Sequence, residues 1–81
     1  MSSVIVIFKV YPEEGALESV TDKVKQLSPQ DMKVEDLAFG IKILKAAFKF
    51  NDEQTNSSAI EEKLAKLEGV SQVEVEEETL L

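Results

Sequence analysis

The chain contains no cysteine, no histidine and no arginine among its 81 residues. Without cysteine it has no disulfide framework and no thiolate ligand for a metal, and thiol redox chemistry is excluded. Without histidine it lacks the commonest general base and the usual ligand of transition metals. We therefore expect a protein that has no catalytic residue, no cofactor and no metal site.

The charge is one-sided, because sixteen aspartates and glutamates oppose nine lysines and give a formal net charge of −7. This balance argues against general affinity for nucleic-acid phosphates and for anionic membranes. The absence of arginine, whose planar fork reads phosphates and bases, strengthens the argument. No run approaches the roughly 20 apolar residues that span a bilayer, and the apolar start lacks a signal peptide's basic region. We expect a cytoplasmic protein with no direct nucleic-acid or membrane partner.

The hydrophobic pattern of the first half predicts a strand followed by a helix. Residues 3–11 alternate between two faces, as a β-strand does. From about Glu14 the period becomes helical, and Pro29 ends the segment because it disfavours helical geometry at Ser28. The apolar stripe of this helix consists of Leu17, Val20, Val24 and Leu27.

The second half predicts two strands, a helix and a final strand. Residues 32–37 read as a short edge strand and residues 41–50 as the longest strand. Ser58 and Glu61 have the form of a capping box that opens the second helix. Gly69 follows the apolar stripe of this helix, at the position where a glycine in the left-handed conformation commonly ends a helix. Residues 70–78 alternate again with a period of two, as a β-strand does. The complete order is βαββαβ.

Two βαβ units that share one sheet form the ferredoxin-like arrangement of the α+β class. We expect one domain over residues 1–81, with a four-stranded antiparallel sheet and two helices on one face. If one set of alternating residues faces the helices, four isoleucines gather on the open face: Ile5, Ile7, Ile41 and Ile43. Such an apolar patch would bind a protein partner, or be covered by residues 79–81 or by a second copy of the chain in a weak homodimer.

The stretch "LAFGIKIL" at residues 37–44 places a glycine inside an apolar β-run. Glycine weakens a strand, so a turn between the second and third strands is the better explanation of Gly40. There it would supply a bulge or a positive φ and present Phe39 at the edge of the sheet. The pattern by itself favours a core position over a contact position for Phe39.

The segment "AFGIKIL" resembles the "FGIKKL" stretch of the translation elongation factor 1-beta family, the guanine-nucleotide exchange factors for elongation factor 1-alpha. The segments "VIVIFKVYPE", "FND" and "LEGVSQVEV" resemble the archaeal members, and the likeness covers nearly the whole chain. The resemblance implies the same fold, and GDP release from elongation factor 1-alpha during translation elongation, without bond chemistry. It also implies that Phe39 contacts the second domain of the GTPase and that Gly40 aims it.

The C-terminus departs from the better-known eukaryotic relatives, which end in a Lys-Leu pair whose lysine enters the magnesium and phosphate site of the GTPase. Here Leu80 stands in the place of that lysine and Leu81 in the place of the terminal leucine. The resemblance thus implies partner contact by both, without a cation to displace Mg²⁺. The acidic residues 76–78 read more simply as a solvated edge than as competitors for Mg²⁺.

Three other functions share the predicted topology. An RNA-recognition module stacks bases on aromatic side chains of its first and third strands, where this chain carries isoleucines. A small acylphosphatase-like enzyme would need an arginine at a phosphate-binding loop, and this chain has no arginine. The remaining alternative to an exchange factor is a ligand-sensing or protein-interaction module that dimerises through its sheet.

Overall fold

The structure, a computed structural model, describes residues 3–81. The elements, in chain order, are β1 (Ser3–Pro12), α1 (Leu17–Lys25), β2 (Asp31–Asp36), the 3₁₀ turn η1 (Ala38–Gly40), β3 (Lys42–Asn51), α2 (Ser57–Ala65) and β4 (Val70–Leu80). The predicted βαββαβ order is confirmed. No helix within residues 3–81 is long and apolar enough to cross a membrane.

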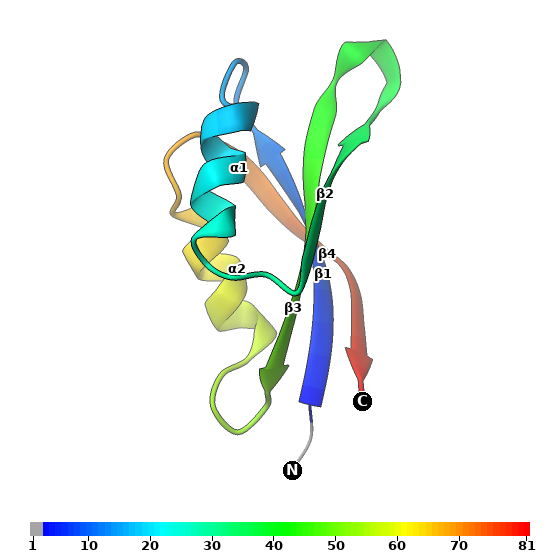
Figure 1. Cartoon of the computed structure of the whole chain (residues 1–81), viewed down its shortest axis with the longest axis vertical. Coiled ribbons are helices and arrows are strands. Elements are labelled where there is room, and N and C mark those ends of the chain that lie inside the picture. The colour runs from blue at the N-terminus through cyan, green and yellow to red at the C-terminus, as the bar shows by residue number, and fades with distance from the viewer. Residues whose placement is uncertain (1–2) are drawn as a thin grey trace.

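The strands form one antiparallel sheet in the order β2-β3-β1-β4, so that β1 and β3 are central and β2 and β4 are the edges. Both helices pack on the same face of this sheet (Figure 1). The ferredoxin-like arrangement and the edge position of β2 are therefore confirmed. The fold is elongated, with extents of 42 × 23 × 16 Å, and the β2–β3 hairpin and the C-terminus lie at opposite ends (Figure 1).

The core lies between the sheet and the helices. Alternate residues of the two central strands supply one side of it, because successive side chains of a strand point to opposite faces. The rings of Phe8 and Phe48 meet edge to face, with centroids 5.9 Å apart. The most completely buried members of this core are Val6, Phe8, Val10, Val20, Val24, Leu44, Ala46 and Leu64. The structure thus shows which faces of β1 and β3 are buried against the helices, a choice that alternation in the sequence left open.

The helices begin at other residues than the sequence predicts. Helix α1 starts at Leu17 rather than near Glu14, because Gly15 has a φ of +78° and leaves the helical region. The capping box at Ser58 and Glu61 is wrong. Asn56 is the N-cap of α2, and its side-chain oxygen accepts a hydrogen bond of 2.9 Å from the N–H of Ala59.

Gly69 joins α2 to β4 in a left-handed conformation, with a φ of +93°, as predicted. It lies three residues beyond the C-cap of α2, Lys66. A Cβ atom at Gly69 would stand 3.1 Å from Val20 Cγ2 and 3.2 Å from the Cβ of Ala16. The glycine therefore serves the close approach of this loop to α1 as well as its own turn.

Candidate partner-binding site

The β2–β3 hairpin ends in a fully exposed aromatic ring. Phe39 is 99% exposed, and its backbone has a φ of +62°, in the left-handed region that bulky residues rarely adopt. Gly40 follows with a φ of +75°, as predicted. The N–H of Leu37 donates a 2.7 Å hydrogen bond to the carbonyl of Ile41 and closes the loop. The core position that the pattern favours for Phe39 is wrong, because the tight turn carries the ring beyond the helices.

This arrangement is unfavourable for the isolated domain in two ways. A left-handed conformation destabilises a residue other than glycine by about 1–2 kcal/mol. An exposed phenylalanine ring also forgoes the roughly 1.5–3 kcal/mol that its burial would contribute. Backbone strain of this kind concentrates at functional sites, and so the tip of the hairpin is a candidate contact site.

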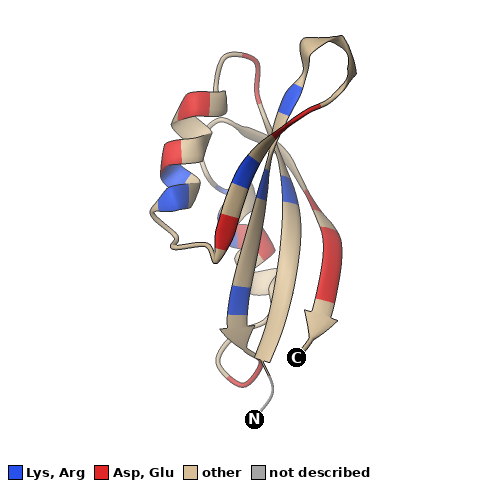
Figure 2. Cartoon of the chain, turned by 45° about the vertical axis from the view of Figure 1, so that its right-hand side comes forward, with Lys and Arg blue, Asp and Glu red and all other residues tan. Residues whose placement is uncertain are grey.

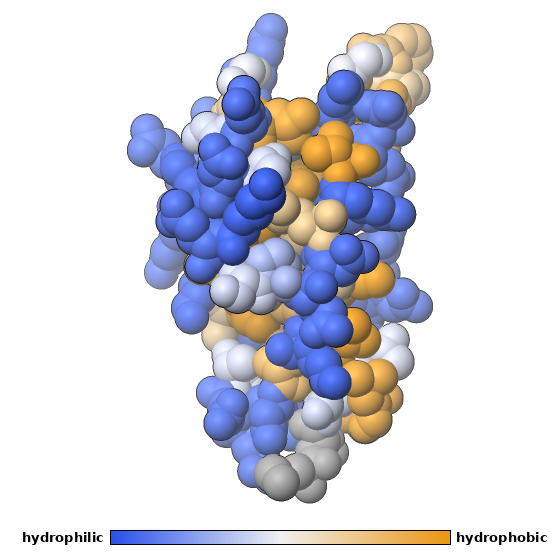
Figure 3. Space-filling view, viewed as in Figure 1, coloured by the Kyte–Doolittle hydropathy of each residue, from blue (hydrophilic) through white to orange (hydrophobic). Residues whose placement is uncertain are grey.

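Apolar surface continues down the hairpin from Phe39. Val34, Leu37 and Ile41 are exposed there, Ile41 to 55%. Figure 3 shows this apolar surface at one end of the molecule, beyond the hydrophilic helices. A cleft of about 540 Å³ lies at the base of the hairpin, lined by Gly40, Ile41 and Lys42 and by residues 12–15 and 17. Val34 and Leu37 were not among the predicted contact residues, because their spacing alone does not show that the helices stop short of the hairpin.

A second apolar surface lies at the C-terminal end. Leu80 and Leu81 are 67% and 62% exposed. Leu80 stands opposite Val4 of β1, and the N–H of Leu81 donates a 2.7 Å hydrogen bond to the carbonyl of Ser3. Residues 79–81 therefore extend the edge strand, and the expectation that they cover the open face is wrong.

The open face carries no continuous isoleucine patch. Ile5 and Ile7 are half-buried on β1, Ile41 lies before β3 at the hairpin, and Ile43 is only 1% exposed. Charged side chains from all four strands lie across the middle of this face. The prediction failed because alternation along one strand does not show which side chains of the neighbouring strands cover it.

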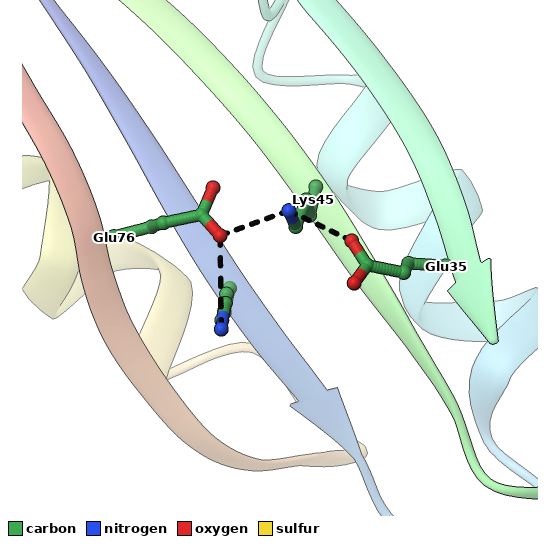
Figure 4. A network of polar contacts seen from close by, with 4 residues as sticks. Glu35, Lys45 and Glu76 are labelled. Atoms are coloured by element: carbon green, nitrogen blue, oxygen red, sulfur yellow. Dashed lines mark ion pairs between the residues drawn. The ribbon is translucent and has the colours of Figure 1, made fainter. Parts of the chain in front are cut away.

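These charged side chains form a connected network (Figure 4). Lys45 Nζ lies 2.7 Å from Glu35 Oε2 and 2.8 Å from Glu76 Oε1, and Lys9 Nζ lies 3.6 Å from the same Glu76 oxygen. Hydrogen bonds to Glu35 and Glu76 raise the pKa of Lys45 to about 12. The hydrogen bond from Lys45 lowers the pKa of Glu76 below its usual range, although partial burial opposes the shift.

The remaining charge of the sheet is unevenly distributed. Acidic residues gather along β4, beside central strands that carry lysines (Figure 2). Within residues 3–81, no group of three or more His, Cys, Asp or Glu side chains is arranged to hold a metal ion. What the described surface offers a partner is two apolar ends and an acidic edge.

Comparisons with known proteins identify relatives over nearly the whole chain. Residues 5–81 match the family described as "EF-1 guanine nucleotide exchange domain". The "Elongation factor 1-beta" of Methanosphaerula palustris is 36% identical over 84 residues, which cover 99% of each chain. The protein of the same name from Methanoregula boonei is 37% identical with the same coverage. That from Aeropyrum pernix is 34% identical and covers 94% of this chain and 93% of its own.

Proposed function

The chain belongs to the family of EF-1 guanine nucleotide exchange domains, and from this membership we propose that it drives GDP release by gripping elongation factor 1-alpha with its two apolar ends. The family resemblance seen in the sequence is confirmed, and with it the role as an exchange factor in translation elongation. The ferredoxin-like ligand-sensing or interaction module is not favoured. This two-ended grip, meaning contact at the Phe39 hairpin and at the C-terminus, is supported most directly by the full exposure of Phe39 at the end opposite the C-terminus.

Phe39 is the first contact, made with the second domain of the GTPase. An exposed aromatic ring that becomes buried in a complex is a typical hot spot, because it adds large apolar contact area at little cost in side-chain entropy. Gly40 and the strained turn fix the direction of the ring before binding. The exposed Ile41 and the neighbouring cleft extend the contact toward the body of the domain.

Leu80 and Leu81 are the second contact, made at the nucleotide site. No basic residue follows Lys66 in this sequence, so no lysine of the tail replaces Mg²⁺ there. The tail instead acts as an apolar wedge that distorts the pocket. The half-buried Ile5 and Ile7 border the tail on β1, opposite Thr79 and Glu77, whereas Ile43 lies toward the hairpin end of β3 and contributes to the sheet rather than to the tail.

Exchange then follows from linkage, without making or breaking a bond. A partner that binds the nucleotide-free GTPase more tightly must, by reciprocity, weaken the binding of GDP by the same factor. Each 1.4 kcal/mol of such coupling changes the affinity about tenfold. The domain therefore works as an exchange factor rather than as an enzyme, and it acts in the cytoplasm without contacting nucleic acid or a membrane.

The net charge of −7 supports rapid encounter with a basic surface of the GTPase. Because salt screens such attraction, the association rate should fall as the ionic strength rises, whereas the apolar contacts should keep the dissociation rate nearly constant.

Titration of cognate elongation factor 1-alpha, nucleotide-free and GDP-bound, tests the proposal. We expect at least about tenfold tighter binding to the nucleotide-free form, since exchange by linkage requires that difference. Equal affinity for the two forms would contradict it. Sedimentation of the chain alone tests the alternative, because a stable sheet-to-sheet dimer would have twice the monomer mass of 9.0 kDa.

A further inference from the structure

We propose that the cleft beside the Phe39 hairpin binds a basic side chain, lysine or arginine, from the second domain of the GTPase. The aliphatic stem of that side chain lies on the apolar residues that line the cleft, and its charged head pairs with Glu13 and Glu14. This inference rests on the proposed function, in which Phe39 contacts the second domain, and it names the chemistry that the surface next to the ring recognises.

Two segments that are far apart in the sequence form this cleft. One is the hairpin, through residues 40–42, and the other is the connection from β1 to α1, through residues 12–15 and Leu17. The cleft has a volume of about 540 Å³. Because Gly40 directly follows the exposed Phe39, a partner that buries the ring also stands over the cleft.

Much of the lining is apolar and open. Pro12, Leu17 and Ile41 supply apolar side chains, and Ile41 is largely exposed. Gly15 and Gly40 line the cleft as bare backbone, and a Cβ atom added at either would meet no heavy atom within 4 Å apart from its chain neighbours. Lysine and arginine bury their long stems on such apolar surface while they keep the charged head in a polar setting.

The connection that carries the two glutamates is held in place by the backbone. The N–H of Glu13 donates a 2.7 Å hydrogen bond to the carbonyl of Gly69, and the N–H of Ala16 donates a 2.9 Å hydrogen bond to the carbonyl of Glu13. The second bond closes a tight turn in which Gly15, with a φ of +78°, occupies the position that requires a positive φ. The backbone of this turn therefore needs no further ordering when a partner binds, which favours affinity.

The charges around the cleft favour a cation. Glu13 and Glu14 are exposed, and neither forms an ion pair within residues 3–81. Lys42 is the one cation of the described chain that lines the cleft, and its Nζ lies 3.9 Å from Asp36 Oδ1, so its charge is offset within the hairpin. Figure 2 shows the acidic connection before α1 at the same end of the molecule as the hairpin.

Other occupants fit this lining less well. An anionic group would face the two unpaired carboxylates of Glu13 and Glu14, with only Lys42 to attract it. A purely apolar side chain would take water from these carboxylates without replacing its hydrogen bonds, which is unfavourable. A basic side chain with a long stem satisfies both the apolar and the acidic part of the lining.

Titration of nucleotide-free elongation factor 1-alpha with the double variant Glu13→Gln, Glu14→Gln tests the proposal. Glutamine keeps the size of each side chain and removes its charge. We expect the dissociation constant to rise about tenfold, mainly through faster dissociation, because loss of one partner of a charge pair buried in an interface acts on the dissociation rate. The urea midpoint should match that of the wild type, since both side chains are exposed.

The matched control is the double variant Glu61→Gln, Glu62→Gln, which removes two charges from α2, away from the hairpin (Figure 1). Neither of these glutamates forms an ion pair within residues 3–81. Weaker long-range attraction slows association in both double variants, but only the cleft variant should dissociate faster. A dissociation rate of the cleft variant equal to that of the wild type, or an equal increase in the control, would overturn the proposal.

A third variant, Ile41→Ala, distinguishes a basic occupant from an apolar one. We expect it to weaken binding as well, because it removes part of the surface on which the stem lies. Loss of affinity in Ile41→Ala without any loss in the glutamine double variant would mean that an apolar side chain fills the cleft, and would overturn the proposal.

Binding and exchange are separate readouts of these experiments. If the wild type binds the GTPase but does not accelerate GDP release, the proposed function fails, while the dissociation rates of the variants still decide what the cleft binds. If the wild type accelerates GDP release and the cleft variant dissociates no faster, the proposed function stands and the basic occupant is refuted.

Discussion

Replacement of Phe39 by alanine should separate binding from folding. The side chain is 99% exposed and is not part of the core, so its removal takes no packing from the free domain. Surface substitutions of this kind change the free energy of unfolding by no more than about 0.5 kcal/mol. We therefore expect the urea midpoint of Phe39→Ala to match that of the wild type.

The loss of affinity should be much larger. Complete burial of a phenylalanine side chain contributes about 1.5–3 kcal/mol, and truncation of interface hot spots typically weakens binding by about 2 kcal/mol or more. A loss of about 2–3 kcal/mol corresponds to a dissociation constant roughly 30- to 150-fold higher. Because the tail at the other end is unchanged, the maximal rate of GDP release at saturation should be preserved.

Two further variants sharpen the experiment. Phe39→Gly removes the ring and also the strain of the left-handed residue, whose φ is +62°. It should stabilise the domain by up to about 1 kcal/mol while it weakens binding as much as alanine does. Phe39→Leu keeps apolar bulk and should fall between alanine and the wild type in affinity.

The assay is a titration of nucleotide-free elongation factor 1-alpha, combined with urea unfolding of each variant alone. Loss of several kcal/mol of stability in Phe39→Ala would mean that the ring belongs to the core. An affinity equal to that of the wild type would mean that the hairpin is not the contact site. Either result would refute the reasoning from exposure and strain.

Three other predictions concern the fold. Gly69→Ala should destabilise the domain by about 1–3 kcal/mol in urea, because its φ is +93° and the new Cβ would lie 3.1 Å from a side chain of α1; a neutral result would contradict the close approach. Asn56→Ala should lower the free energy of unfolding by about 1 kcal/mol, whereas Ser58→Ala should be nearly neutral. A larger loss for Ser58→Ala than for Asn56→Ala would mean that Ser58 is the N-cap after all. The stability difference between the wild type and Lys45→Met should be present near neutral pH and should shrink as the pH falls through the lowered pKa of Glu76, because protonation of that carboxylate removes its ion pair with Lys45. A difference that persists in acid would show that the ion pair is not its source.

The parts of the fold that strict alternation encodes were predictable. Val6, Phe8 and Val10 fall on one face of β1 by period alone, although alternation does not show whether this face or the one with Ile5 and Ile7 is buried. Helix boundaries were less predictable, because Asn56, Ser57 and Ser58 are all good N-cap residues and only the backbone path shows which one is used.

The site was only partly predictable for physical reasons. Gly40 signals a positive φ, but that Phe39 shares this conformation and stands clear of the core depends on how far the helices extend. The burial of Ile43 depends on side chains from other strands. The pairing of β4 with β1 shifts at Glu76, a β-bulge in a run of identical residues, where alternation carries no information about register.

The most direct test of the central claim is the release of fluorescent GDP from cognate elongation factor 1-alpha, measured with and without this protein across Mg²⁺ concentrations. A two-ended grip that distorts the pocket predicts acceleration that persists at high Mg²⁺, because no lysine of the tail competes for the metal site. No acceleration at any Mg²⁺ concentration would contradict the claim.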